Sequence, residues 1–242
     1  MIWVYGGGYS SGERRIPESA DLGYACVGSY FARRGFITVI PDYRLVPNVR
    51  FPGQAEDIRD AVIWTIQHAE HLTTTSTPNP DVQGIYLMGH SAGAANALTA
   101  LVLPESADSA VLRHSIAGMI LCAGTHSFRA LSSESPIWEP LVQYWGDRKE
   151  IEANASTGLV SSASDSVVTS LPEVLVVEGE REPGWLLTVG KEFREILEAR
   201  TGKKVERIVA KGHNHISYNW VLGTGEGEEW AEEVIRWIGT SN

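Results

Sequence analysis

The sequence contains little cysteine and no long apolar segment, and both absences narrow what the protein can be. Only Cys26 and Cys122 occur among its 242 residues. Each lies in an apolar stretch, so we expect two buried thiols rather than a disulfide framework. No run approaches the roughly 18 apolar residues that a membrane-spanning helix needs. The N-terminus also lacks the charged-then-apolar layout of a signal peptide.

Positive charge is in short supply as well. The chain has 20 Lys and Arg residues against 30 Asp and Glu residues, a formal net charge of -10. An acidic surface repels phosphate backbones and anionic membranes, so we expect no nucleic-acid partner. Hydrophobic residues make up 43% of the chain, which is enough for one compact domain over residues 1–242.

The first residues already have the pattern of a folded domain. Residues 2–5 are an apolar strand pattern that runs directly into Gly6-Gly7-Gly8. A domain seldom begins at such a point, so a signal peptide, if the natural protein has one, is expected upstream of Met1. As written, the sequence predicts a cytoplasmic protein.

Short apolar runs alternate with longer segments of helical period along the chain. This alternation is typical of βα units around a mainly parallel sheet with helices on both faces, an α/β fold. Helices are expected over 54–70, directly after Ser91, around Phe193 and around Trp230. The predicted strands are 2–5, 36–41, 84–88, 116–122, 174–178 and 204–209.

The most informative motif is Gly-His-Ser-Ala-Gly at 89–93. It follows an apolar strand and precedes an alanine-rich helix, which is the context that a nucleophile elbow requires. The glycines are needed because side chains two residues before or after the serine would collide with the neighbouring strand and helix. The motif therefore predicts that Ser91 is a nucleophile.

A nucleophilic serine needs backbone N–H donors for the negative oxygen that forms when it attacks a carbonyl. The glycine run after the first strand can approach a substrate closely because it has no side chains. The N–H of Ala92 lies at the positive end of the following helix. These features predict an oxyanion hole formed by Gly7, Gly8 and Ala92.

Residues 125–170 have weak periodicity, many serines and several aromatic side chains. We interpret this segment as a lid or excursion over the strand tips. Its aromatic side chains either pack within the segment or line a substrate pocket, and the sequence leaves both alternatives open. The candidate pocket residues are Tyr9, His90, Trp138, Tyr144 and Trp145.

Motifs along nearly the whole chain resemble those of the α/β hydrolases. They lie at 5–9, 41–45, 51–57, 89–93, 179–183 and 212–217. The resemblance is to the hormone-sensitive-lipase-like and carboxylesterase branch and to the kynurenine-formamidase-like proteins. It implies the α/β-hydrolase fold without the two antiparallel strands that normally precede the strand at 2–5. Residues 36–41 would then form an apolar sheet edge, through which a homodimer could pair.

The family uses a serine, an acid and a histidine in that order along the chain. By register, the resemblance implies Glu182 as the acid, where the family has an aspartate before a proline, and His215 as the histidine. Glu178 and Glu180 are alternatives for the acid. His213 is the alternative for the base.

Two further motifs concern the support of the site rather than its chemistry. The family usually has a histidine before its three glycines, where this chain has Tyr5, and this difference puts the geometry of that loop in question. In the family, the run that corresponds to Asp42-Tyr43-Arg44 braces the loops near the oxyanion turn.

The resemblance implies acyl transfer from a small or medium-sized carboxylic ester. Ser91 would attack the carbonyl, His215 would take its proton, Glu182 would hold the imidazole, and water would hydrolyse the acyl-enzyme. An amidase or formamidase with the same triad, a binding protein that has lost catalysis and a lyase are the alternatives. No cofactor is expected. A metal is not expected either, because only His126 could join His213 and His215 as a ligand.

Overall fold

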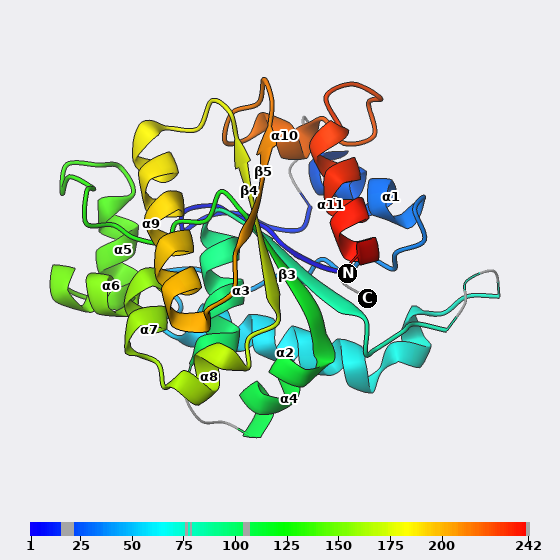
Figure 1. The fold of residues 1–242 in the computed structure, drawn as a ribbon, viewed down its shortest axis with the longest axis horizontal. Coiled ribbons are helices and arrows are strands. Elements are labelled where there is room, and N and C mark those ends of the chain that lie inside the picture. Colours follow the sequence, from blue (N-terminus) through cyan, green and yellow to red (C-terminus); the bar gives the residue numbers. More distant parts are fainter. Residues whose placement is uncertain (16–21, 76, 78, 104–106, 241–242) are drawn as a thin grey trace.

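The fold is seen in a computed structural model, which describes residues 1–242 apart from 16–21, 76, 78, 104–106 and 241–242. Its centre is a parallel sheet (Figure 1), whose strands within the described residues follow the order β1-β2-β3-β4-β5. The strands are β1 (Ile2–Val4), β2 (Ile85–His90), β3 (Ile116–Cys122), β4 (Glu173–Gly179) and β5 (Glu206–Ala210). Consecutive parallel strands require crossover connections, which the helices supply.

Helices cover both faces of the sheet, as predicted (Figure 1). One face packs against α1 (Leu22–Ala32), α10 (Ser217–Trp220) and α11 (Glu229–Thr240). The other packs against α2 (Gly53–Gln67), α3 (Ala92–Val102), α4 (Ala107–Ser115) and α9 (Gly184–Thr201). The helix predicted over 54–70 is α-helical only as far as Gln67, and a 3-10 turn, η1 (Ala69–Leu72), follows it.

The predicted α/β class and parallel sheet are confirmed, but the predicted strand at 36–41 is wrong. This segment meets β1 at a single bridge, where the Trp3 N–H donates to the Val39 oxygen at 2.8 Å and the Val39 N–H donates to the Met1 oxygen at 3.0 Å. The ladder does not continue, and Pro41 has no N–H to extend it. All six residues of the segment are partly buried. Dimerisation through this edge stays a prediction.

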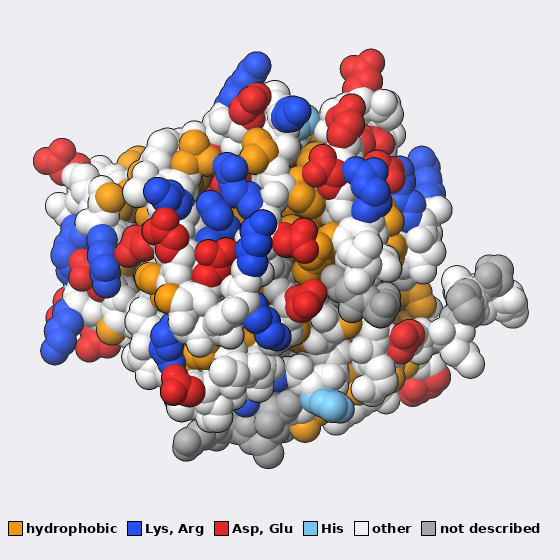
Figure 2. All heavy atoms as spheres, viewed as in Figure 1, with side chains coloured by type: hydrophobic (Ala, Val, Ile, Leu, Met, Phe, Trp, Pro, Cys, Tyr) orange, Lys and Arg blue, Asp and Glu red, His pale blue; other side chains and the backbone are white. Residues whose placement is uncertain are grey.

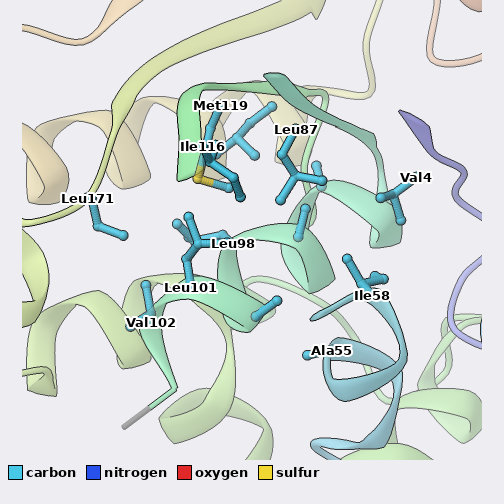
Figure 3. Close-up of a cluster of buried hydrophobic side chains, with 14 of the residues drawn as sticks. Val4, Ala55, Ile58, Leu87, Leu98, Leu101, Val102, Ile116, Met119 and Leu171 are labelled. Atoms are coloured by element: carbon cyan, nitrogen blue, oxygen red, sulfur yellow. The ribbon is translucent and has the colours of Figure 1, made fainter. Parts of the chain in front are cut away.

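The larger hydrophobic core lies between the sheet and the helices α2 and α3 (Figure 3). Leu87 and Met119 of the sheet meet Leu98 of α3 and Ile58 of α2, and all four side chains are fully buried. Every residue of α3 is buried. The alanines of this helix allow it to lie close to the sheet, and this close packing fixes the position of the residue before it, Ser91.

Residues 125–170 form four short helices rather than one long element. Two of them begin at side-chain caps, where Asp147 accepts the Glu150 N–H and Ser164 accepts the Val167 N–H. Their short lengths explain why the sequence shows weak periodicity here. They are α5 (Trp138–Trp145), α6 (Arg148–Asn154), α7 (Ser156–Ser162) and α8 (Asp165–Thr169). A role of the segment as a lid stays a prediction.

Acidic and basic side chains alternate over the face shown in Figure 2, so the net charge of -10 does not form a single acidic patch there. Within the described residues, no three His, Cys, Asp or Glu side chains are arranged to hold a metal ion. None of the helices in this part of the chain is long and apolar enough to cross a membrane.

One buried histidine, His126, belongs to the segment 125–170 and packs against α9. Its ring is fully buried and stacks on Phe193 with 3.8 Å between the ring centroids. Neither ring nitrogen has a hydrogen-bond partner among the described residues. Burial lowers the pKa of His126 to about 3, so the side chain is neutral at pH 7.

We predict that protonation of His126 destabilises the folded protein in acid. Because the folded pKa of about 3 lies below the pKa of about 6.5 expected in the unfolded chain, this contribution to stability is complete above about pH 6.5 and is lost as the pH falls. His126→Phe removes the titration. The free energy of unfolding in urea should therefore fall less steeply between about pH 6.5 and 4 in this variant than in the wild type. The exposed His71→Phe is the matched control, and equal slopes for His126→Phe and the wild type would contradict the prediction.

Candidate active site

Ser91 lies in a strained turn between β2 and α3. Its φ of 54° and ψ of -124° are rare for a residue with a side chain. The Ser91 N–H donates to the Cys122 oxygen on β3 at 2.8 Å, and the Ser91 oxygen accepts the Ala94 N–H at 3.1 Å. The turn is therefore held by the sheet on one side and by the helix on the other.

The glycines that flank Ser91 are needed for the close contacts expected from the sequence. A Cβ atom on Gly93 would lie 2.3 Å from the Tyr5 oxygen and 2.4 Å from the Val4 oxygen, both at the end of β1. A Cβ atom on Gly89 would lie 2.7 Å from the Cα atom of Ala94. A side chain at either position would separate the turn from β1 or from its own helix.

Ser91, His215 and Glu182 form one chain of hydrogen bonds. His215 Nε2 lies 3.0 Å from Ser91 Oγ, and His215 Nδ1 lies 2.8 Å from Glu182 Oε2. A carboxylate accepts the Nδ1–H, which leaves the Nε2 lone pair to accept the serine hydroxyl proton. The Glu182 side chain is only 1% exposed, and its second oxygen accepts the Gly179 N–H at 3.3 Å. The structure thus brings the three candidate residues into direct contact.

The alternative acids have other partners. Glu178 is buried, and its carboxylate accepts from Arg207 Nε at 2.6 Å. Glu180 is exposed and accepts the Gly212 N–H at 2.8 Å. Of these three glutamates, the one in contact with His215 within the described structure is Glu182.

The alternative base, His213, is held by the loop around it. Its Nε2–H donates to the Gly227 oxygen at 2.9 Å, and its Nδ1 accepts from Ser217 Oγ, 3.1 Å away. The side-chain oxygen Oδ1 of Asn214 accepts the Ser217 N–H at 3.0 Å. These bonds fix the backbone that carries His215.

His90 also stabilises the loop that carries His213 and His215. Its Nε2 lies 2.8 Å from the carbonyl oxygen of His215, which can only accept, so Nε2 carries the hydrogen. Burial, and then the neighbouring His215 ring, lower the pKa of His90 to about 3. His90 is therefore a neutral donor that holds the histidine loop against the serine turn.

The glycine loop after β1 presents free amides beside Ser91. Gly7 has a φ of +140° and Gly8 a φ of +59°, and both line the same cavity as Ser91. Among the described residues, no hydrogen bond uses the N–H of Gly7 or of Gly8. Ala92 is the first residue of α3, where an N–H has no partner within its own helix. The backbone amides of the three candidate oxyanion residues, Gly7, Gly8 and Ala92, thus have no hydrogen-bond partner among the described residues.

Two buried amide side chains hold the far end of the glycine loop, at Tyr9. Gln54 Nε2 donates to the Tyr9 oxygen at 2.7 Å, and Asn96 Nδ2 donates to Gln54 Oε1 at 2.9 Å. The Tyr9 hydroxyl is 2.7 Å from Thr125 Oγ1. Sequence reasoning missed Gln54 and Asn96, because an apolar periodicity assigns polar positions to the helix surface.

The near end of the loop is braced by the run 42–44, in agreement with the role that the family resemblance implies. Tyr43 donates its hydroxyl to the Tyr5 oxygen at 2.9 Å, and Tyr5 donates its own hydroxyl to Asp42 at 3.1 Å. Arg14 pairs with Asp42 at 2.8 Å. Tyr5 thus fastens the loop from the position where the family usually has a histidine.

A cavity of about 530 Å³ lies over Ser91 and His215. Two of the predicted pocket residues, Tyr9 and His90, line it. The others belong instead to an aromatic cluster packed around Tyr9: Trp138, Tyr144 and Trp145. Tyr9 belongs both to this cluster and to the cavity wall, so the cluster stabilises the wall on the side away from the cavity.

Large side chains that the sequence pattern did not indicate complete the wall. Trp185 and Leu186 follow Glu182, the candidate acid, whereas Ile216 and Trp220 follow His215. The loops that carry Glu182 and His215 converge on Ser91, so apolar side chains directly after them face the same space. That proximity was the signal available in the sequence.

Comparison with known proteins identifies the family. Residues 1–219 match the family described as alpha/beta hydrolase fold, and the chain belongs to this family. Esterase LipC of Mycobacterium tuberculosis is 24% identical over 238 residues, which cover 94% of this chain and 52% of the relative. The chain therefore spans about half the length of this curated relative.

Solved structures share the fold. Esterase B from Lactobacillus Rhamnosis (HN001) superposes with a TM-score of 0.75 at 18% identity, over 99% of this chain and 75% of that chain. The esterase of the archaeon Pyrobaculum calidifontis has a TM-score of 0.70 at 20% identity, over 99% and 74%. The resemblance drawn from the motifs, to the α/β hydrolases and their esterase branch, is confirmed.

The close approach at Gly93 gives a test of the turn. A methyl group there, 2.3 Å from the Tyr5 oxygen, fits only if α3 moves away from β1. We expect Gly93→Ala to lower the free energy of unfolding in urea by about 3 kcal/mol. Gly239→Ala in α11 is the matched control, because its Cβ meets nothing within 4 Å and alanine favours a helix by up to about 1 kcal/mol. Equal free energies of unfolding for Gly93→Ala and Gly239→Ala would contradict the close approach of α3 to β1.

Proposed function

We propose that this protein is a serine hydrolase that cleaves a carboxylic ester through an acyl-enzyme on Ser91. The observation that carries the proposal is the hydrogen-bonded chain of Ser91, His215 and Glu182 beside the free amides of Gly7 and Gly8. Membership of the α/β hydrolase fold family supports it, and the relatives compared above are named as esterases.

In the first half of the proposed reaction, Ser91 Oγ attacks the ester carbonyl and its proton passes to His215 Nε2. The Nδ1–H stays bonded to Glu182, whose negative charge stabilises the imidazolium that forms. Because this carboxylate is buried, the attraction is less screened than in water. His215 then gives the proton to the alcohol oxygen, the C–O bond breaks, and the acyl group stays on Ser91.

The carbonyl oxygen becomes negative during this attack, and we assign its stabilisation to the amides of Gly7, Gly8 and Ala92. These donors belong to backbone that is already fixed, so they need no reorganisation as the charge develops. The N-terminal end of α3 adds a partial positive charge beside Ala92. Loss of one such donor typically lowers kcat about 100- to 1,000-fold.

In the second half, water takes the place of the alcohol. His215 removes a proton from the water, the hydroxide attacks the acyl carbon, and the proton returns to Ser91 as the acid leaves. The same three residues and the same amides serve both halves. The products are one alcohol and one carboxylic acid, and no cofactor is consumed.

The cavity limits the substrate to a small or medium-sized ester. Its volume of about 530 Å³ and its apolar wall suit an organic molecule with few charges. Thr125 and Ile137 bring the segment 125–170 into that wall. We propose that this segment closes the single domain over the site and shapes the space available to the acyl group.

Replacement of the nucleophile tests the function directly. Ser91→Ala should lower kcat for p-nitrophenyl butyrate by about 10⁴-fold or more, because no other group can form the acyl-enzyme. A fluorophosphonate probe should label the wild type at Ser91 and leave the variant unlabelled. Turnover by Ser91→Ala at the wild-type rate would contradict the proposal.

A pair of glutamate variants tests the acid. Glu182→Gln keeps the shape of the side chain but removes the charge that stabilises the imidazolium, so we expect kcat to fall about 10²- to 10⁴-fold. Glu180→Gln is the matched control, because an amide oxygen can still accept the Gly212 N–H. It should stay within about twofold of the wild type. A larger loss in Glu180→Gln than in Glu182→Gln would exchange their roles.

A further inference from the structure

One buried polar side chain of the cavity wall, Asn219, has no role in the proposed reaction. Asn219 of α10 is 1% exposed and lines the cavity. Its carbonyl oxygen is buried without a partner, and its amide forms no side-chain hydrogen bond with the described residues. Buried polar groups are almost always hydrogen-bonded. The oxygen is sealed from solvent, whereas the unpaired Nδ2–H is not among the sealed atoms, so this donor on the cavity wall points to a ligand acceptor.

A second open polar group lies on the same side of the cavity. Tyr24 of α1 lines the wall, and α1 packs against α10. Its hydroxyl has no hydrogen-bond partner within the described structure. The neighbouring hydroxyls differ, because Tyr9 is paired with Thr125 at 2.7 Å and Ser11 donates to the Gly7 oxygen at 2.8 Å. The α1–α10 side of the cavity wall thus carries two polar side chains, Tyr24 and Asn219, without a hydrogen-bond partner among the described residues.

The position of Asn219 indicates which part of an ester it faces. Asn219 comes shortly after His215 in the chain, on the short helix α10 that continues the histidine loop. His215 must deliver its proton to the alcohol oxygen, so that oxygen lies beside Nε2 when the bond breaks. The cavity-lining residues that follow His215 along the chain are Ile216, Asn219 and Trp220, and they offer a wall for the alcohol part.

We propose that Asn219, together with Tyr24, binds a polar oxygen on the alcohol part of the substrate. This inference rests on the proposed esterase function and names its substrate class: esters of alcohols that carry a further hydroxyl group, rather than esters of plain alkyl alcohols. The Asn219 Nδ2–H donates, so it can bind the oxygen of such a hydroxyl group. The exposed side chains of Ile216 and Trp220 cover the carbon skeleton beside it.

The test compares two esters with the same acyl group and the same number of alcohol carbons. Glycerol 1-monobutyrate carries hydroxyl groups on its alcohol part, and propyl butyrate does not. The quantity measured is the ratio of kcat/KM for the glycerol ester to kcat/KM for the propyl ester. Each protein serves as its own reference in this ratio, so the different chemical reactivity of the two esters cancels between variants.

Asn219→Leu replaces the amide with an apolar group of similar size. We expect the ratio to fall about tenfold, mainly through a higher KM for the glycerol ester, and Tyr24→Phe should lower it about threefold. Asn154→Leu is the matched control, because Asn154 lies on α6 and does not line the cavity. Its ratio should equal that of the wild type. An unchanged ratio in both Asn219→Leu and Tyr24→Phe would overturn the inference.

Fluorophosphonate labelling of Ser91 shows whether each variant is folded. If Asn219→Leu is not labelled, Tyr24→Phe decides alone, since it deletes a single hydroxyl and keeps the ring. The two proposals fail in different ways. A wild type that hydrolyses neither ester contradicts the proposed function. A wild type that hydrolyses both, with a ratio that neither variant changes, contradicts only the role of Asn219 and Tyr24.

Discussion

The arrangement of the site depends on how closely the start of α3 approaches the end of β1. The gap at Gly93 leaves room for a hydrogen atom but not for a methyl group, which would lie 2.3 Å from the Tyr5 oxygen. On the other side of the contact, a Cβ atom on Gly6 would lie 2.8 Å from the Cβ of Ser91. One backbone contact therefore sets the distance between the serine turn and the loop that offers free amides. Side chains elsewhere stabilise this contact, but they do not create it.

Features that are local in the sequence could be predicted, and features that depend on a distant partner could not. Strand, turn and helix around Ser91 follow one another without interruption, and buried parallel strands appear as continuous apolar runs. The segment 36–41 has the same composition, yet it pairs at a single bridge because a strand also needs a neighbour along its whole length. Composition describes what a segment can bury, whereas pairing depends on where the other backbone lies.

The same distinction holds within the site. The chemistry of Ser91 is visible in its motif, but nothing local separates Glu182 from Glu178, and the choice between them came from family register. In space the two differ clearly, because one carboxylate meets His215 and the other meets an arginine. The sequence left open whether the aromatic residues of 138–145 line a pocket or pack together, and in the structure they pack against Tyr9. Weak periodicity in so short a helix as α5 does not reveal which neighbour its side chains will pack against.

His90 precedes Ser91, His213 and His215 share one loop, and hydrogen bonds give these three histidines different roles. Both nitrogens of His213 are engaged with the loop, whereas Nε2 of His215 faces the serine. The ring of His90 lies 4.8 Å from that of His215, so a charge on His90 would oppose the imidazolium that the proposed reaction forms there. At this distance in a protein interior, such repulsion is stronger than in water. Burial keeps His90 neutral, and the positive charge on His215 then meets the carboxylate of Glu182 without a second cation beside it.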